Sequence, residues 1–337
     1  MKQSLTRKLL SLSLVLIIAI LFSVTTDYFL NWKNICNLFR EVAVAGLLSL
    51  GVTFVIIGGG IDLSTGAVMG LSGMIASRLI VGTLWPIWVI VAICLAAGLL
   101  CGFLNGILVT KFHLSEFIAT FSSMFVYRGI VYVLAFREGG QIATKAVNDK
   151  QFLKIGGTIG GIYYMTFVWL AVVILGYFVL KQTKFGTYVY SLGANPKAAA
   201  LTGIPVDKMK IATFLISAVL SALAGIFSLA WQGSVALDTG SGMEFKAIAA
   251  VVVGGVALTG GRGDTVGTAI GSVFMIMIMN GITKYNMPTE YQTIAYGVII
   301  ILMAIFDSLY FAMMDRRAIQ GKREEQRREA EKEAGAQ

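Results

Sequence analysis

Three ionisable residues, Asp62, Arg128 and Glu244, stand within largely apolar stretches of the chain. A charged side chain inside a lipid bilayer is costly, so one that occurs there usually has a functional role and a partner. Such groups could contact a polar substrate in transit or carry the proton or ion of an ion-driven transporter. For Asp62 a structural role is the alternative, as a helix cap or the partner of a basic residue. Arg128 needs a partner or an aqueous cavity, and Asp62 and Glu244 are both candidate partners.

The residue types that most enzymes use are scarce. His113 is the only histidine, and it lacks the second ligand and the His-Glu-x-x-His spacing of a zinc site. The three cysteines, Cys36, Cys94 and Cys101, have no metal or redox spacing. The glycine-rich run at 260–263 follows no strand and precedes no Gly-Lys-Ser/Thr, so it does not predict a phosphate-binding loop. The sequence therefore predicts no catalytic residues and no cofactor or metal bound by this chain.

Membrane helices must position these residues. Hydrophobic residues make up 57% of the chain and charged residues 13%, and the mean hydropathy is +0.79. Soluble domains carry about 25% charged residues, so the composition predicts an all-α polytopic membrane protein. Apolar runs of about 20 residues can cross a bilayer, and here they predict about ten transmembrane helices. These are 9–30, 42–58, 64–83, 85–110, 117–136, 162–180, 211–231, 245–258, 265–283 and 291–311, and Asn31–Glu41 is expected to be a polar outer turn.

Lysine and arginine predict the orientation. With the N-terminus inside, the cytoplasmic segments hold most of the 27 basic residues, as the positive-inside rule requires. An even number of helices returns the C-terminus to the cytoplasm. The net charge of +9 then reflects topology and attraction to anionic lipids, and no nucleic-acid partner is expected. Residues 1–25 have the basic and apolar regions of a signal peptide but no small-residue cleavage site, which favours an uncleaved first helix.

The segment 181–210 is the longest internal polar run on the predicted cytoplasmic side, and membrane-length apolar segments flank it. Its middle, 196–202, is expected to form one short helix. Pro196 suits the first turn of a helix, Gly203 suits the position after its end, and Pro205 prevents continuation. A short helix between two spans, with basic residues on each side, predicts a docking element.

This segment resembles the cytoplasmic coupling loop of ABC-importer permeases, most closely the monosaccharide branch that includes ribose, xylose, galactose, arabinose and autoinducer-2 permeases. The family form G-x-N-x-x-A-A-x-x-x-G-I is matched here, and the predicted coupling residues are Gly193, Ala194, Asn195, Ala198, Ala199, Gly203 and Ile204. Two other stretches, 58–66 (GGGIDLSTG) and 240–268, also resemble that family. Residues 111–120 depart from it, because Ser115-Glu116 stands where the family usually has a proline before the phenylalanine.

The resemblance implies the ABC-importer permease fold, in one transmembrane domain over 1–314 with a charged cytoplasmic tail at 315–337. It implies import of a monosaccharide or a related small polyol or furanosyl compound through the bacterial inner membrane. A partner ATPase would bind ATP and Mg²⁺ and contact the coupling loop. A periplasmic or lipid-anchored sugar-binding protein would face the outer loop 137–162. A second permease copy or a sister permease would complete the path, and the sequence leaves that choice and the sugar open.

The predicted membrane-embedded motif and pathway residues are Asp62, Ser64, Asn105, Arg128 and Glu244. Ser64 is expected to cap the helix that follows it. Asn105 lies close to a stripe of glycines spaced by four residues, which favours a role in joining helices. The alternative function is an ion-coupled secondary transporter, in which Asp62, Arg128 or Glu244 would be the coupling groups.

Overall fold

The computed structural model describes residues 2–136 and 146–285, with side chains from residue 12 onward, and residues 288, 291, 294, 297, 298, 301, 302 and 305. Two compact units divide the chain, Met1–Met287 and Pro288–Gln337, and the elements below belong to the first. Most of the predicted helix 291–311, all of the tail 315–337 and residues 137–145 of the outer loop lie outside the described residues. A single domain over 1–314 stays a prediction.

Among the described residues, seven helices are long and apolar enough to cross a membrane. They are α2 (Trp32–Ile57), α3 (Thr65–Gly82), α4 (Ile87–Thr110), α5 (Glu116–Ala135), α7 (Tyr164–Gln182), α10 (Val206–Gln232) and α12 (Thr265–Lys284). Helix α1 (Lys2–Thr25) contributes a shorter apolar stretch, Leu12–Thr25. The chain is therefore a helical, multi-pass protein as predicted, whereas the count of about ten spans stays a prediction.

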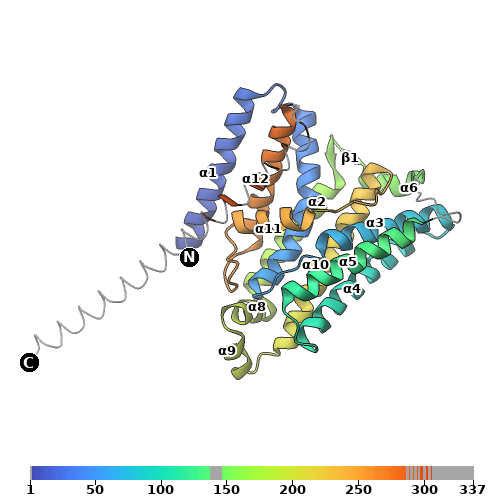
Figure 1. Ribbon diagram of the computed structural model, residues 1–337. Coiled ribbons are helices and arrows are strands. Elements are labelled where there is room, and N and C mark those ends of the chain that lie inside the picture. Colours follow the sequence, from blue (N-terminus) through green and yellow to red (C-terminus); the bar gives the residue numbers. More distant parts are fainter. Residues whose placement is uncertain are drawn as a thin grey trace, which may run out of the picture. The chain divides into compact units, whose positions relative to one another are not determined.

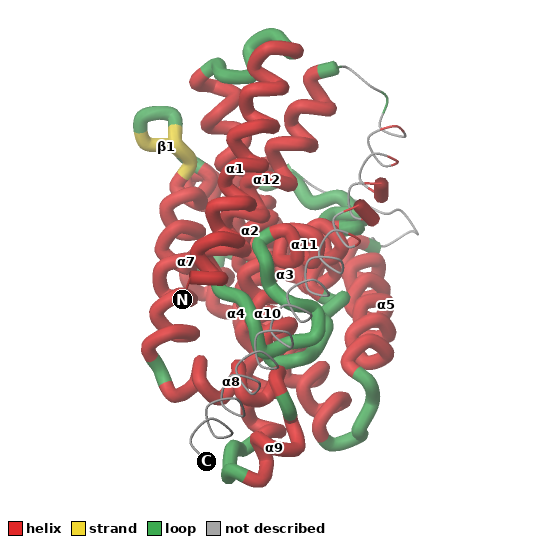
Figure 2. The backbone as a smooth tube through the Cα atoms, turned by 90° about the vertical axis from the view of Figure 1, so that its left-hand side faces the viewer, coloured by secondary structure: helices red, strands yellow, loops and turns green. Residues whose placement is uncertain are grey.

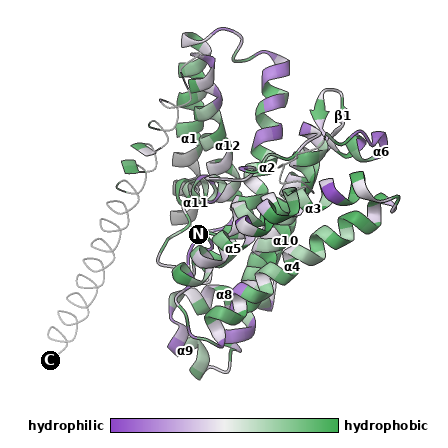
Figure 3. Cartoon of the chain, turned by 45° about the vertical axis from the view of Figure 1, so that its right-hand side comes forward, coloured by the Kyte–Doolittle hydropathy of each residue, from purple (hydrophilic) through white to green (hydrophobic). Residues whose placement is uncertain are grey.

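Short elements occupy the two ends of this unit. At one end lie α8 (Lys184–Ala194) and α9 (Pro196–Leu201), and at the other lie α6 (Lys150–Leu153), the 3-10 turn η1 (Lys154–Gly156) and a hairpin (Figures 1 and 2). Strands β1 (Thr158–Ile159) and β2 (Ile162–Tyr163) of that hairpin are antiparallel, with Thr158 opposite Tyr163. Hydrophilic residues gather at both ends and apolar residues between them (Figure 3).

Helix α10 lies at the centre and packs against α2, α3 and α4. The α4 interface is close because Gly98, Gly102 and Gly106 face α10. A Cβ placed on Gly102 would lie 2.5 Å from the Phe214 carbonyl oxygen, and one on Gly98 would lie 2.7 Å from the Ala222 Cβ. The glycine stripe was predicted to form a helix contact, and it does so between α4 and α10. Small residues commonly allow such close contacts between membrane helices.

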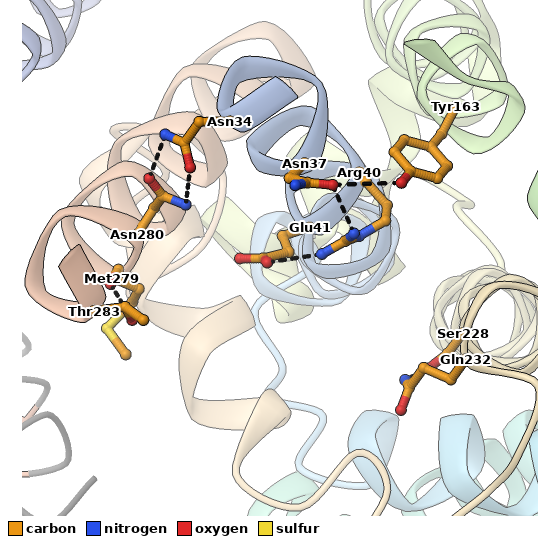
Figure 4. Close-up of polar contacts among 10 residues, drawn as sticks. All are labelled: Asn34, Asn37, Arg40, Glu41, Tyr163, Ser228, Gln232, Met279, Asn280 and Thr283. Carbon is orange, nitrogen blue, oxygen red and sulfur yellow. Dashed lines mark hydrogen bonds and ion pairs between the residues drawn. The ribbon is translucent and has the colours of Figure 1, made fainter. Parts of the chain in front are cut away.

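The prediction of a polar turn at Asn31–Glu41 is wrong, because α2 begins at Trp32. The polar side chains there are satisfied within and between helices (Figure 4). Asn34 and Asn280 of α12 exchange amide hydrogen bonds of 2.9 and 3.3 Å. The Arg40 guanidinium donates to Asn37, pairs with Glu41 at 3.0 Å and stacks 3.6 Å from the Trp231 ring centroid.

The prediction of a span at 245–258 is also wrong. Helix α11 (Met243–Val253) has 11 residues, so it is only roughly 16 Å long and cannot cross a bilayer alone. It ends where Gly254 and Gly255 follow, and Gly255 has a φ of +85° that side chains rarely adopt. A nonhelical segment, 254–264, then leads to α12.

Candidate functional site

Two breaks in helical structure bring the predicted motifs together. The first is 58–64 between α2 and α3, and the second is 254–264 between α11 and α12. The two breaks touch, because a Cβ placed on Gly260 would lie 2.9 Å from the Gly59 Cα, and the Gly261 N–H donates to the Ile57 carbonyl at the end of α2 at 2.8 Å. Irregular backbone at membrane depth is tolerated where protein covers it or where it lines a cavity, and the carbonyls freed at such breaks are common functional groups in transporters.

Asp62 lies in the first break and is only 1% exposed. One carboxylate oxygen, Oδ1, accepts from the Ser64 N–H at 2.9 Å and the Ser64 hydroxyl at 2.7 Å. The other, Oδ2, accepts from the Ser217 hydroxyl of α10 at 2.7 Å. Three donors from two segments therefore satisfy this buried carboxylate without a basic partner among the described residues.

The hydrogen bonds continue from Ser64 into α4 and α5. Asn105 donates its amide N–H to the Ser64 hydroxyl at 2.8 Å. Its amide oxygen accepts from Ser123 at 2.6 Å and from Tyr127 at 3.1 Å. We call these residues the Asp62 network, whose members are Asp62, Ser64, Asn105, Ser123, Tyr127 and Ser217. Because the network joins the first break to α4, α5 and α10, it fixes the start of α3 among its neighbours.

Ser64 stands at the N-cap position of α3, as predicted, but its side chain makes no cap hydrogen bond. The hydroxyl instead donates to Asp62 and accepts from Asn105. The prediction that Ser64 caps the helix through its side chain is therefore wrong, because its oxygen accepts from the Asn105 amide instead of from an N–H of α3.

Arg128 and Glu244 approach the other side of the α3 N-terminus. The Arg128 guanidinium donates to the carbonyls of Thr239 at 2.6 Å and Leu237 at 3.4 Å. Glu244 is 5% exposed, and its Oε1 accepts from the Gly242 N–H at 3.2 Å. A Cβ placed on Gly66 would lie 2.3 Å from the Glu244 Oε2. Arg128 therefore binds the turn segment before α11 and does not pair with Asp62.

The segment 181–210, predicted to be the coupling loop, contains two helices where one is predicted. Helix α9 corresponds to the predicted 196–202 helix, with Asn195 as the N-cap that accepts from the Ala198 N–H and Pro196 in the first turn. Gly203 follows with a φ of +82°. Helix α8 precedes it and was not predicted. Its apolar residues Phe185, Val189 and Leu192 recur at helical spacing, a signal that the search for membrane-length runs passes over.

The predicted coupling residues differ in exposure. Ala194, Asn195, Ala198 and Gly203 are exposed, Ile204 is half-buried, and Gly193 and Ala199 are buried. Leu201, which the sequence did not single out, is 90% exposed at the end of α9. A large apolar side chain in that position offers contact area to another protein.

Gly193 connects α8 to the two breaks. A Cβ placed on it would lie 1.8 Å from the Ile57 carbonyl oxygen and 2.5 Å from the Gly261 nitrogen. A Cβ on Gly260 would lie 2.8 Å from the Gly193 carbonyl oxygen. We call these residues the glycine junction, whose members are Ile57, Gly193, Gly260 and Gly261. Backbone meets backbone there, so a displacement of α8 acts directly on both breaks.

Tyr190 adds a polar contact between α8 and the second break. Its hydroxyl donates to the Gly263 carbonyl at 2.6 Å. Burial raises the pKa of this phenol, and the nearby Asp264 raises it further, so the hydroxyl keeps its proton and remains a donor at physiological pH. The Lys181 ammonium lies 4.8 Å from the centroid of the same ring. The negative face of the aromatic ring attracts this cation.

One ion pair near this end was not foreseen. Glu116, at the start of α5, pairs with Lys210 of α10. Ser115 caps α5 by accepting from the Ile118 N–H at 3.3 Å. The Ser115-Glu116 sequence thus begins the helix with a cap and an acidic first turn.

Comparison with known proteins identifies the family. Residues 34–304 match the model of the family described as "Branched-chain amino acid transport system / permease component". Ribose import permease proteins of Haemophilus influenzae and Bacillus subtilis are each 36% identical to this chain, covering 88% and 86% of it and 91% and 89% of the relative. The xylose transport system permease protein of Escherichia coli is 31% identical, covering 87% of this chain and 90% of the relative. No solved structure matches.

The helical, multi-pass architecture and the match over most of the chain agree. The chain belongs to the family of branched-chain amino acid transport system permease components, in which it is similar to ribose and xylose permeases.

Proposed function

We propose that this chain is the membrane-spanning permease subunit of an ATP-driven monosaccharide importer. The named activities of its relatives support this function, and those at 31% to 36% identity are permeases for two pentoses, ribose and xylose. A pentose is therefore the sugar class we propose. An ion-coupled secondary transporter is not favoured by these relatives.

The observation that carries the proposal is the exposed α9 helix beside a buried Gly193. Helix α9 and the residues that flank it expose Leu201, Asn195, Ala198 and Gly203. These are the surface on which a separate ATPase subunit would dock. ATP and Mg²⁺ would be bound by that subunit, and the coupling segment would lie in the cytoplasm with both termini of the chain.

The proposed mechanism runs from docking to the glycine junction. Closure of the ATPase pair moves α8 and α9, and Gly193 transmits this movement to the Ile57 carbonyl and to Gly260 and Gly261. Since α2, α3, α11 and α12 begin or end at those breaks, their inner ends shift relative to α10. Alternating access would follow from that rearrangement, with a second permease copy or a sister permease on the other side of the path.

The end that carries β1, β2 and α6 would lie outside the bacterial inner membrane. A periplasmic or lipid-anchored sugar-binding protein would dock there and deliver the sugar. On this assignment Arg128 and Glu244 are pathway residues, whereas Asp62, Ser64 and Asn105 position the helices around the path through the Asp62 network.

The docking surface can be tested by co-purification of the permease with its ATPase after Leu201→Asp. Leu201 makes little contact within the chain, so the variant should fold and insert but recover at least about 10-fold less ATPase, since burial of a leucine contributes about 1.5–3 kcal/mol. Leu84, also exposed, lies at the predicted outer end of α3, and Leu84→Asp is the matched control that should retain the ATPase.

Equal ATPase recovery with Leu201→Asp and wild type would contradict the docking assignment. Ala199 is a poor site for this test because it is buried, so a charge there would disturb the permease itself. Gly203 is also a poor site, since its φ of +82° strains any side chain.

A further inference from the structure

Two buried polar atoms without a hydrogen-bond partner lie in adjoining elements of the described structure. They are the Glu244 Oε2 and the Thr65 Oγ1. Thr65 is fully buried, and Glu244 is almost so. A buried polar atom normally has a partner, and leaving one unpaired costs about 1–3 kcal/mol, more for a charged group. Both carboxylate oxygens of Asp62, by contrast, accept hydrogen bonds.

The surroundings of Glu244 contain further polar groups that a ligand could use. Helices α3 and α11 both begin here, and neither has a side-chain cap. The two starts are in contact, because a Cβ placed on Gly240 would lie 2.1 Å from the Gly66 carbonyl oxygen. Helix N-termini present N–H groups and a partial positive charge. Discontinuous helices that meet in this way commonly form the substrate sites of transporters.

Arg128 of α5 lies beside the next turn of α3. Its Nη1 would be 3.1 Å from a Cβ placed on Gly70, four residues after Gly66. The charge of Arg128 acts on Glu244, although no ion pair within 4.0 Å joins the two in the described part of the chain. Arg128 therefore donates to the Thr239 and Leu237 carbonyls, and the Glu244 Oε2 keeps its unused acceptor capacity.

The charge pattern selects the chemical class of that group. An anion would meet the Glu244 carboxylate, and a cation would meet Arg128 and two positive helix ends. A neutral polyol fits both sides, because each hydroxyl donates to a carboxylate oxygen and accepts from an N–H. Carboxylate acceptors also form stronger hydrogen bonds than neutral ones.

We infer that the Glu244 Oε2 and the Thr65 Oγ1, with Arg128 on the next turn, form a contact site for the hydroxyl groups of the transported monosaccharide. The inference rests on the proposed function and locates one contact along the sugar's path. Both atoms are covered in this structure, so the sugar reaches them when the segment 237–244 separates from α3 during the transport cycle.

The test is ATP-driven uptake by proteoliposomes that hold the complete importer. The permease variants are Glu244→Gln and Thr65→Val, and the substrates are the transported pentose and those of its deoxy analogues that the binding protein still loads. If Glu244 accepts a hydrogen bond from one hydroxyl of the pentose, the Glu244→Gln substitution weakens that contact. The deoxy analogue that lacks this hydroxyl loses the same contact. The ratio of pentose uptake to uptake of that analogue should then change by about 10-fold in Glu244→Gln.

Glu41→Gln is the matched control, since Glu41 already has Arg40 as its partner, and its uptake ratios should equal those of wild type. Unchanged ratios in both Glu244→Gln and Thr65→Val would overturn the inference, whether or not overall uptake falls. If Glu244→Gln abolishes all uptake, Thr65→Val, which removes only a hydroxyl, decides the question by the same ratio. Absence of ATP-driven uptake by the wild type would instead contradict the proposed function.

Discussion

Gly193 of α8 lies so close to the Ile57 carbonyl of α2 that a Cβ on Gly193 would sit 1.8 Å from that oxygen. No side chain can occupy this space without moving one backbone away from the other. The contact joins the segment assigned to ATPase docking to the C-terminus of a membrane helix. It therefore connects α8 directly to the end of α2.

Gly193→Ala should uncouple ATP hydrolysis from transport. The methyl group displaces α8 from the glycine junction, while the exposed face of α9 remains intact and still binds the ATPase. We expect normal ATPase co-purification with at least about 10-fold slower sugar uptake, which corresponds to about 1.4 kcal/mol in the coupled step. Gly129→Ala is the control, because a Cβ there meets nothing within 4 Å. Wild-type uptake by Gly193→Ala would show that the junction does not transmit movement.

Glu116→Gln should lower the thermal stability of the purified permease. Glu116 and Lys210 are 22% and 23% exposed and join α5 to α10, so loss of their pairing is expected to cost about 1 kcal/mol. The nearby pair of Lys111 and Asp207 is 66% and 52% exposed, with 3.4 Å between the charged atoms. Asp207→Asn should therefore leave the melting temperature unchanged. Equal effects of the two substitutions would mean that burial does not decide the strength of these pairs.

Asp62 should be required for assembly of the helices rather than for recognition of the sugar. Asp62→Ala leaves the donors of Ser64 and Ser217 without their acceptor, at a cost of about 2–4 kcal/mol. Asp62→Asn keeps one carbonyl oxygen and should lose less. In thermal unfolding of the purified permease, wild type should be the most stable, Asp62→Asn intermediate and Asp62→Ala the least stable. A fully stable Asp62→Ala that fails only in sugar uptake would instead place Asp62 in the pathway.

Residues with a local cause were predictable from the sequence. Helix α9 lies where Pro196 and Gly203 indicated, because proline fits a helix start and glycine its end whatever surrounds them. The glycines of α4 face another helix, as their spacing by four residues predicted. The burial of Asp62 follows in the same way from three glycines and a carboxylate within an apolar run.

Features that depend on partners far along the chain were not predictable. Asn34 and Arg40 looked like residues of a polar turn, yet they are helical because Asn280 and Trp231, each some two hundred residues away, satisfy them. Helix α11 was expected to span the membrane because its sequence is apolar. Hydropathy does not distinguish an apolar segment covered by lipid from one covered by other helices. The close packing of Gly193 likewise involves Ile57 and Gly261, which no local pattern connects to it.

Sugar uptake by proteoliposomes that contain the permease, its ATPase and its binding protein tests the proposed function most directly. For an ATP-driven importer, uptake of a pentose requires ATP inside the vesicle when the ATPase faces inward, and it persists when ionophores collapse the proton and sodium gradients. Uptake without ATP that stops with the ionophores would contradict the proposed function and make this chain an ion-coupled transporter.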